Sequence, residues 1–244
     1  MKNKTSTGSL IGGRQSDRSA PFRVAAVTKA AATLNLEPKD ILVVSGIGCS
    51  SNFPGFFNSY GFHGLHGRSV PIASGAKLAN HDLNVIVTGG DGDGYGIGLG
   101  HFVHAMRRNL DITYVVMNNG VYGLTTGQTS PTSEKGFKTK STPDGVIDGP
   151  VNPIALALVS GATFVARGFS GDPNHMSNLI AKGLSHRGFS LIDIFSPCVT
   201  YNKINTFDIY RDSVYNLESN ALNVIYLEEA IRISYEWENK IPIG

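Results

Sequence analysis

Short apolar runs alternate with segments of helical periodicity along most of this 244-residue chain. The apolar runs predict strands at residues 41–44, 83–88, 112–117, 162–166 and 189–195. Between them, apolar and small residues at helical spacing predict helices at residues 22–36, 70–80, 97–108, 152–160 and 174–186. Strands that alternate with helices are typical of an α/β fold with a doubly wound, mostly parallel sheet.

Three parts of the chain interrupt this alternation. Residues 1–20 are rich in Ser, Gly, Arg and Lys and predict a flexible segment. Residues 120–149 are rich in Thr and Pro, and a loop of that length is usually functional or disordered. Residues 201–244 mix aromatic and charged side chains, which suggests a cap or an interface arm. We therefore expect a flexible segment at 1–20, one main domain at 21–200 and a C-terminal arm at 201–244.

Polar side chains follow two of the predicted strands. Asp91 lies in the glycine-rich stretch GGDGDGYGIG, and Asn118 and Asn119 end the next strand. Neighbouring parallel strands would bring these side chains to one sheet edge, where ligands bind in open α/β sheets. Oxygen ligands of this kind suit Mg²⁺, which usually binds one or two carboxylates together with substrate phosphates. The glycines let backbone N–H groups approach such phosphates.

These residues also admit other interpretations. The glycine-rich stretch does not match the dinucleotide fingerprint or the P-loop, and its glycines could simply form a tight turn. The paired Asp91 and Asn119 argue against that, because buried polar side chains need partners. In the glycine-rich loop that holds His63, His66 and Arg68, the side chains are either exposed or form a cationic wall for phosphate or carboxylate.

Composition narrows the class of protein. The net charge of +2 and 41% hydrophobic residues fit a soluble globular protein and give no indication of nucleic-acid binding. No stretch approaches the roughly 18–20 apolar residues that span a bilayer, and the first residues lack the apolar core of a signal peptide. Two cysteines are too few for a disulfide scaffold, so we expect a cytoplasmic protein.

The two cysteines, Cys49 and Cys198, each follow a predicted strand. They are either small buried side chains or they meet in space and share a metal or an iron–sulfur cluster. Two thiolates alone do not complete a tetrahedral ligand set.

Six motifs together resemble a known family. The motifs, in chain order, are GIGCSS, YGFHGLHGR, GGDGDGYGIG, NNGVYGLTTGQTSPT, NPIALALVSGATFVARG and SPCVTYNKINT. They are similar to the β subunits of 2-oxoacid:ferredoxin oxidoreductases, including those that act on pyruvate and on 2-oxoglutarate. The similarity runs from about residue 22 to the end and implies a thiamine diphosphate (ThDP)-binding fold at 21–200.

The resemblance also implies the site. It assigns Mg²⁺ to Asp91, to the side chain of Asn119 and to the backbone carbonyl of Val121. It assigns the diphosphate to Gly92, Asp93, Gly123 and Leu124. The residues expected against the thiazolium and pyrimidine rings are Ile47, Gly48, Cys49, Ser50, Leu65, His66, Gly67 and Arg68.

The implied activity is the coenzyme A-dependent oxidative decarboxylation of a 2-oxoacid, with electrons passing to ferredoxin. The implied partner is an α subunit, which in this family supplies the Glu that activates the cofactor. Acidic residues are sparse in the first half of the chain: only Asp82, Asp91 and Asp93 occur between Asp40 and Asp111. We therefore assign no catalytic acid to this chain.

The chain departs from the family pattern at three places. Relatives usually carry W-C-x-x-C-G before the first helix, and Ser16 and Ser19 stand here at the two cysteine positions. Because hydroxyls are poor iron ligands, a [4Fe–4S] cluster on Cys49 and Cys198 is doubtful. Asn52 stands where relatives often have Lys or Arg, and the chain stops at KIPIG, where relatives typically continue. Two alternatives follow: one half of a non-oxidative ThDP enzyme, or a degenerate subunit that lacks the cluster.

Overall fold

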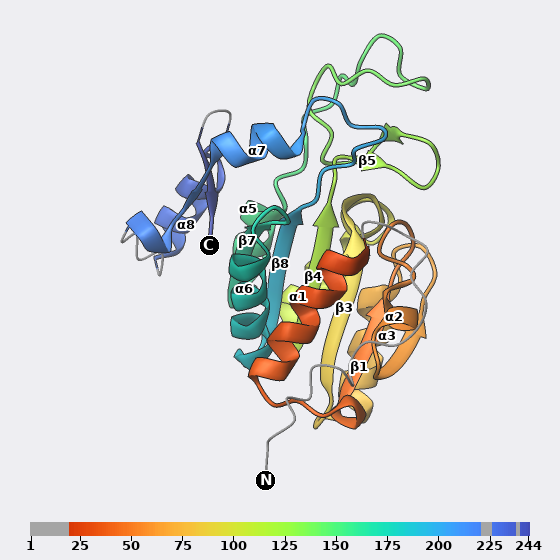
Figure 1. The fold of residues 1–244 in the computed structure, drawn as a ribbon, viewed down its shortest axis with the longest axis vertical. Coiled ribbons are helices and arrows are strands. Elements are labelled where there is room, and N and C mark those ends of the chain that lie inside the picture. Colours follow the sequence, from red (N-terminus) through yellow and green to blue (C-terminus); the bar gives the residue numbers. More distant parts are fainter. Residues whose placement is uncertain (1–19, 221–225, 238–239) are drawn as a thin grey trace.

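The computed structural model describes residues 20–220, 226–237 and 240–244 (Figure 1). Its centre is a six-stranded sheet with the strand order β2-β1-β3-β4-β8-β7, in which every pair of neighbours is parallel. The doubly wound, mostly parallel α/β fold expected from the sequence is thus confirmed. The strands are β1 (Ile41–Ser45), β2 (Tyr60–His63), β3 (Asn84–Gly90), β4 (Ile112–Asn118), β7 (Phe164–Phe169) and β8 (Phe189–Phe195).

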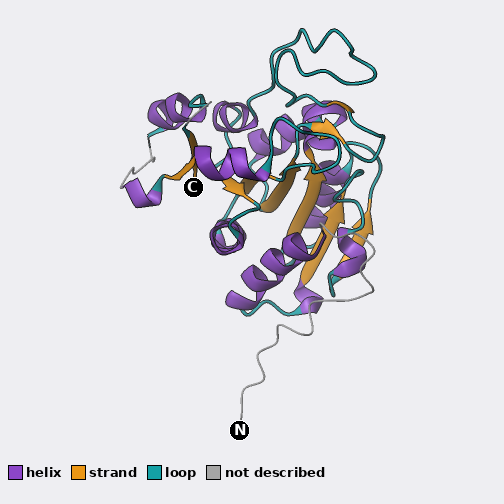
Figure 2. Cartoon of the chain, turned by 45° about the horizontal axis from the view of Figure 1, so that its top comes forward, coloured by secondary structure: helices purple, strands orange, loops and turns teal. Residues whose placement is uncertain are grey.

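Helices cover both faces of the sheet (Figure 2). One face packs against α1 (Ala20–Thr33), α2 (Phe53–Phe56) and α6 (Pro173–Ser185), and the opposite face against α3 (Ser69–Ala79), α4 (Leu99–Arg108) and α5 (Pro153–Val159). Every residue of β4 and of β8 is buried, as expected for parallel strands that helices cover on both sides.

The sequence locates the helix starts well. Asn152 accepts a hydrogen bond from the Ala155 N–H at 3.1 Å, and Asp172 accepts one from the His175 N–H at 3.0 Å. In both cases the N-cap side chain precedes a proline at the first helical position.

Three local features differ from the sequence-based expectation. The segment expected as a loop before residue 69 contains the short helix α2 and the edge strand β2, whose four residues are all exposed. A π-helix at Gly92–Ile97 precedes α4, so the regular helix begins two residues later than expected. The segment 120–149 contains the hairpin β5 (Val121–Tyr122) and β6 (Gln128–Thr129).

The C-terminal residues form an arm beside β7. The arm consists of α7 (Phe207–Ser213), β9 (Val214–Asn216), a 3-10 turn (Glu218–Asn220), α8 (Leu227–Ser234) and β10 (Ile241–Ile243). Gly244 exchanges two backbone hydrogen bonds with Arg167 of β7, at 2.9 and 3.0 Å. Residues 1–19 of the predicted flexible segment 1–20, including Ser16 and Ser19, lie outside the described residues, and Ala20 begins α1.

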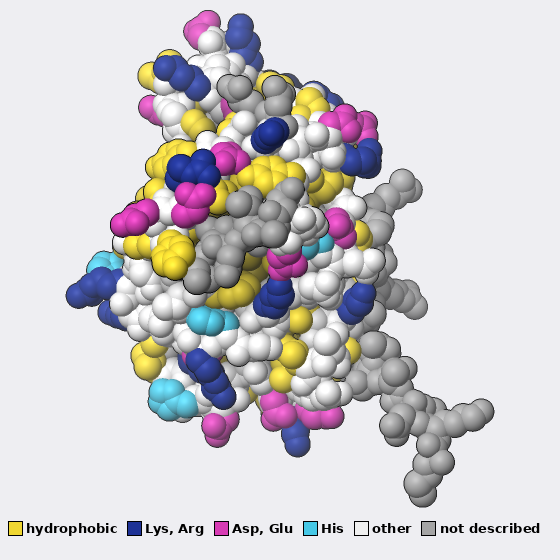
Figure 3. Space-filling view, turned by 90° about the vertical axis from the view of Figure 1, so that its left-hand side faces the viewer, with side chains coloured by type: hydrophobic (Ala, Val, Ile, Leu, Met, Phe, Trp, Pro, Cys, Tyr) yellow, Lys and Arg dark blue, Asp and Glu magenta, His cyan; other side chains and the backbone are white. Residues whose placement is uncertain are grey.

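The described residues on the side of the arm carry side chains of both charges. Basic and acidic side chains are intermixed there (Figure 3). None of the helices in the described residues is both long enough and apolar enough to span a bilayer.

Candidate functional site

The sheet topology brings the polar strand ends together. Strands β3 and β4 are parallel neighbours, with Gly90 opposite Met117, so Asp91 and Asn119 emerge at the same edge. Strand β1 lies between β2 and β3, so the connections that leave β1 and β3 diverge at this point. Such a switch point is where doubly wound sheets form ligand crevices.

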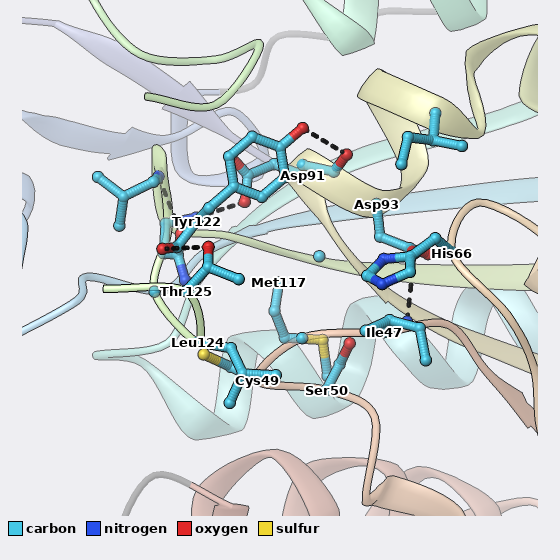
Figure 4. A pocket seen from close by; sticks show the side chains of 17 residues that line it. Ile47, Cys49, Ser50, His66, Asp91, Asp93, Met117, Tyr122, Leu124 and Thr125 are labelled. Atoms are coloured by element: carbon cyan, nitrogen blue, oxygen red, sulfur yellow. Dashed lines mark hydrogen bonds between the residues drawn. The ribbon is translucent and has the colours of Figure 1, made fainter. Parts of the chain in front are cut away.

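A pocket opens at this switch point (Figure 4). It contains all three residues proposed for Mg²⁺ and most of those proposed for the cofactor. Leu65, Gly67, Arg68 and Cys198 do not line it. The lining residues are Ile47, Gly48, Cys49, Ser50, His66, Gly90, Asp91, Gly92, Asp93, Ile97, Met117, Asn119, Val121, Tyr122, Gly123, Leu124 and Thr125.

Asp91 is 1% exposed, and hydroxyl groups surround one of its oxygens. Its Oδ2 accepts hydrogen bonds from Ser130 Oγ at 2.5 Å and from Thr132 Oγ1 at 2.7 Å. Its Oδ1 receives a longer bond, 3.3 Å, from the Asn119 N–H. Burial raises the pKa of the Asp91 carboxyl, and the hydrogen bonds from Ser130 and Thr132 partly offset that increase.

Asn119 and Val121 share a turn beside Asp91. The Asn119 side-chain oxygen accepts the Val121 N–H at 3.0 Å, and the Asn119 carbonyl accepts a bond from Asn202 Nδ2 at 3.1 Å. The turn is therefore fixed on both sides, and its Asn119 N–H contacts the Asp91 carboxylate at 3.3 Å. Carboxylate, carboxamide and carbonyl oxygens are a donor set that fits Mg²⁺.

The Asp93 carboxylate connects two loops of the pocket. Its Oδ1 accepts the Ile47 N–H at 3.2 Å and the Gly67 N–H at 2.8 Å. A Cβ added to Gly46 would lie 1.9 Å from Asp93 Oδ2, so this close approach requires glycine at position 46. Because a carboxylate and a diphosphate repel each other, a role of Asp93 in phosphate binding would use its backbone N–H.

Several lining residues were missed by the sequence analysis. The Tyr122 hydroxyl donates to the Gly92 carbonyl at 3.1 Å and so connects the β5 strand to the glycine-rich turn. Its position inside the motif NNGVYG was the available signal. The other missed lining residues are Gly90, Ile97, Met117 and Thr125.

The two cysteines approach one another at the edge of the pocket. A Cβ added to Gly123 would lie 3.4 Å from Cys49 Sγ and 3.7 Å from Cys198 Sγ. Within residues 20–220, 226–237 and 240–244, however, no group of three or more His, Cys, Asp or Glu side chains could hold a metal. The described residues therefore do not provide the four ligands of a [4Fe–4S] cluster.

A buried polar cluster lies behind the site. The Asp193 carboxylate accepts a bond from the Tyr95 hydroxyl at 2.8 Å and lies 3.3 Å from Asn118 Nδ2. The Arg167 guanidinium is also buried, 5.5 Å from the centre of the Phe195 ring. Burial raises the pKa of Asp193 to about 6, although Arg167 acts in the opposite direction.

This raised pKa predicts a pH-dependent stability. The pKa of an unfolded aspartate carboxyl is 3.8, so between about pH 4 and pH 6 the folded state binds more protons at Asp193. That contribution to the free energy of unfolding should fall by on the order of 3 kcal/mol as the pH rises through the window. Asp193→Asn should remove it, as measured by urea unfolding at several pH values. Asp144→Asn, at an exposed position, is the control, and a pH-independent difference between wild type and Asp193→Asn would contradict the prediction.

Comparisons with known proteins identify the family of the chain. A family model described as "Thiamine pyrophosphate enzyme, C-terminal TPP binding domain" matches residues 46–194; thiamine pyrophosphate is another name for ThDP. A second model, which describes the C-terminal part of the pyruvate ferredoxin oxidoreductase beta subunit, matches residues 198–244. Together the two matches cover residues 46–194 and 198–244 and include the six motifs almost completely.

Individual relatives are named as subunits of 2-oxoacid oxidoreductases or synthases. The chain is 49% identical to the 2-oxoacid:ferredoxin oxidoreductase subunit beta of Saccharolobus solfataricus, over 86% of this chain and 73% of that protein. It is 40% identical to the 2-oxoglutarate synthase subunit KorB of Methanocaldococcus jannaschii, over 88% and 80%. A solved 2-oxoglutarate:ferredoxin oxidoreductase from Magnetococcus marinus, with 2-oxoglutarate, coenzyme A and succinyl-CoA bound, superposes with a TM-score of 0.94 at 39% identity, over 100% of this chain and 84% of that one.

Proposed function

The chain belongs to the β subunits of the 2-oxoacid:ferredoxin oxidoreductases, and we propose that it binds ThDP and Mg²⁺ for the CoA-dependent oxidative decarboxylation of a 2-oxoacid. One observation carries the cofactor proposal. Asp91, the Asn119–Val121 turn and the glycines at 90 and 92 line a single pocket at the switch point of the sheet. Bound ThDP would supply the carbanion and the electron sink of the reaction.

The protein residues orient and hold the cofactor in this proposal. Asp91, Asn119 and the Val121 carbonyl provide oxygen ligands for Mg²⁺, and the backbone around Gly92 and Gly123 accommodates the diphosphate. Met117, Ile47 and Leu124 contribute apolar surface to the same pocket. Apolar walls that exclude water strengthen the electrostatic interactions inside a site.

The substrate proposal is a 2-oxoacid, with 2-oxoglutarate and pyruvate as the candidates. The names of several relatives and the ligands of the Magnetococcus marinus enzyme favour 2-oxoglutarate. The exposed Asn52, at the N-cap of α2, supplies no positive charge where relatives often have one. Recognition of the substrate carboxylate would then depend on other residues, including those of the α subunit.

The pocket also supports an interface with the α subunit. Leu65, Ile97 and Leu124 are large apolar side chains with exposed fractions of 74%, 58% and 65%, and the latter two line the pocket. A surface of this kind beside a cofactor site is suited to cover by a partner. Electron transfer to ferredoxin would take place in that complex.

The isolated chain should be inactive. Of the described residues that line the pocket, only Asp91 and Asp93 are acidic, and neither is free to activate the cofactor, because each already accepts hydrogen bonds from the surrounding loops. The activating Glu is expected on the α subunit. The purified chain, loaded with ThDP and Mg²⁺, should therefore release no CO₂ from pyruvate or 2-oxoglutarate.

Adding the α subunit should make the chain active, which tests the same proposal. The complex should release CO₂ in a manner that depends on ThDP, Mg²⁺ and the 2-oxoacid. Turnover by the isolated, monodisperse chain would contradict the interface, and a complex that binds no ThDP would contradict the proposed function itself.

The incomplete set of cluster ligands favours a second candidate function, a non-oxidative ThDP enzyme half. Such a complex would decarboxylate the 2-oxoacid without coenzyme A and without reducing an electron acceptor. A degenerate subunit would bind the α subunit and leave both activities absent. Product analysis of the complex, with and without coenzyme A and a one-electron acceptor, distinguishes the three outcomes.

A further inference from the structure

Two hydroxyl groups from a distant segment surround the carboxylate of Asp91. Ser130 and Thr132 lie 39 and 41 residues further along the chain, and both contact the same oxygen, Oδ2. They follow the β6 strand and lie at the end of the motif NNGVYGLTTGQTSPT. Neither is assigned a role by the resemblance described above.

The segment that carries these hydroxyls is held rigidly in place. The Ser130 N–H donates to Ser133 Oγ at 2.8 Å, and Ser133 Oγ in turn donates to the Gly120 carbonyl at 2.7 Å. The Val151 N–H donates to the Pro131 carbonyl at 2.9 Å. The two hydroxyls are thus directed at Asp91 by bonds that do not involve the carboxylate itself.

The two oxygens of the Asp91 carboxylate have different hydrogen-bond partners. Each carboxylate oxygen accepts about two hydrogen bonds, and two hydroxyl groups lie within hydrogen-bond distance of Asp91 Oδ2. Oδ1 receives the longer contact, 3.3 Å, from the Asn119 N–H and keeps a lone pair. The orientation of the carboxylate is therefore determined, and the less occupied oxygen is on the side of Asn119.

We propose that Ser130 and Thr132 are positioning residues, which fix Asp91 so that Oδ1 faces the divalent cation. This inference rests on the proposed Mg²⁺–ThDP site and extends it to the groups that orient its central ligand. Hydrogen bonds to a ligating carboxylate commonly determine its orientation and tune its affinity for metal. Without these donors the carboxylate could rotate about its side-chain bonds and would present either oxygen.

Thr132 has a second contact that supports the assignment. Its Oγ1 lies 2.9 Å from the side-chain oxygen of Asn118. The side-chain nitrogen of Asn118 lies 3.4 Å from Asp193 Oδ1. A hydroxyl has one proton, so at any moment Thr132 donates either to Asp91 or to Asn118. Ser130 Oγ, in contrast, lies 2.5 Å from Asp91 Oδ2 and 3.2 Å from Thr132 Oγ1, so its proton goes to Asp91. Removal of the Ser130 hydroxyl should therefore weaken cation binding at least as much as removal of the Thr132 hydroxyl.

The test uses the complex of this chain with its α subunit and measures Mn²⁺, an EPR-visible substitute for Mg²⁺, at saturating ThDP. Ser130→Ala and Thr132→Val should each raise the Mn²⁺ dissociation constant by about 10-fold, and the double variant by up to about 100-fold. Thr132→Ser keeps the hydroxyl and should bind Mn²⁺ within about twofold of wild type.

Thr113→Val is the matched control. Thr113 is a buried threonine of β4, and its hydroxyl donates to the Gly183 carbonyl, away from the pocket. The control should lower the melting temperature and leave Mn²⁺ affinity unchanged, which separates general destabilisation from an effect on the cation.

Different outcomes would reject the positioning role of Ser130 and Thr132 and the Mg²⁺–ThDP site itself. Wild-type affinity in Thr132→Val and in the double variant would overturn the positioning role, as would a Thr132→Ser variant as weak as Thr132→Val. Should the double variant fail to fold, the two single variants still decide. A wild-type complex without any ThDP-dependent Mn²⁺ site would instead reject the proposed function.

Discussion

Replacing Asp91 with alanine should abolish Mg²⁺-dependent ThDP binding. The carboxylate is buried at the carboxyl end of β3, and it is the one negatively charged group among the three proposed ligands. Without it the cation loses its strongest ligand, and the charge of the diphosphate remains uncompensated. We expect ThDP affinity to fall by more than about 100-fold, beyond the range typical of residues that only support a ligand.

Calorimetric titration of ThDP in the presence of Mg²⁺ measures this effect. Asp91→Asn separates charge from shape, because a carboxamide can still accept the Ser130 and Thr132 hydroxyl bonds; it should bind ThDP weakly but fold normally. Asp82→Ala removes an exposed carboxylate elsewhere and should leave affinity unchanged. Unaltered ThDP affinity in Asp91→Ala would show that the cation assignment is wrong.

The strands that could be predicted from the sequence are those buried on both faces. Both β4 and β8 are continuous apolar runs because helices cover the two sides of the sheet at these positions. The edge strand β2 has the sequence YGFH and four exposed residues, so its sequence contains no comparable signal. Its extended conformation arises from pairing with β1, which is a property of the tertiary fold.

The same distinction applies to the site. Asp91 and Asn119 could be located because strand ends and parallel topology determine where they emerge. Ser130 and Thr132 could not, because they reach Asp91 only after the chain folds back through the β5–β6 hairpin. The role of Arg68 stays a prediction: Arg68 does not line the pocket in this structure, and its guanidinium lies 3.5 Å from the Gly67 carbonyl.

The position of the two cysteines bears on the candidate iron–sulfur site. Both sulfur atoms lie close to Gly123, so the two cysteines would contribute two of the four ligands of a shared group. The family motif would supply the other two from W-C-x-x-C-G, where this chain has Ser16 and Ser19. The question therefore reduces to two side chains.

We expect the unmodified chain to bind ThDP and Mg²⁺ but to hold a [4Fe–4S] cluster poorly or not at all. Four thiolates normally hold such a cluster, and a serine hydroxyl would have to ionise near neutral pH to replace one. Even with its α subunit the chain should then fail to reduce ferredoxin. Ser16→Cys combined with Ser19→Cys should restore iron binding after anaerobic reconstitution, measured as iron and sulfide per chain together with visible absorption.

The chain offers a control with the same spacing. Ser6 and Ser9 are also three residues apart in the N-terminal segment, so Ser6→Cys with Ser9→Cys adds the same two thiols at a different place. If position matters, only the pair at 16 and 19 should gain iron in a stoichiometric amount, because only those thiols align with the family motif. Equal iron in both variants would indicate adventitious binding by added thiols. A full cluster on the unmodified chain would show that two cysteines suffice here and would restore the oxidative reaction as the simplest account of the enzyme.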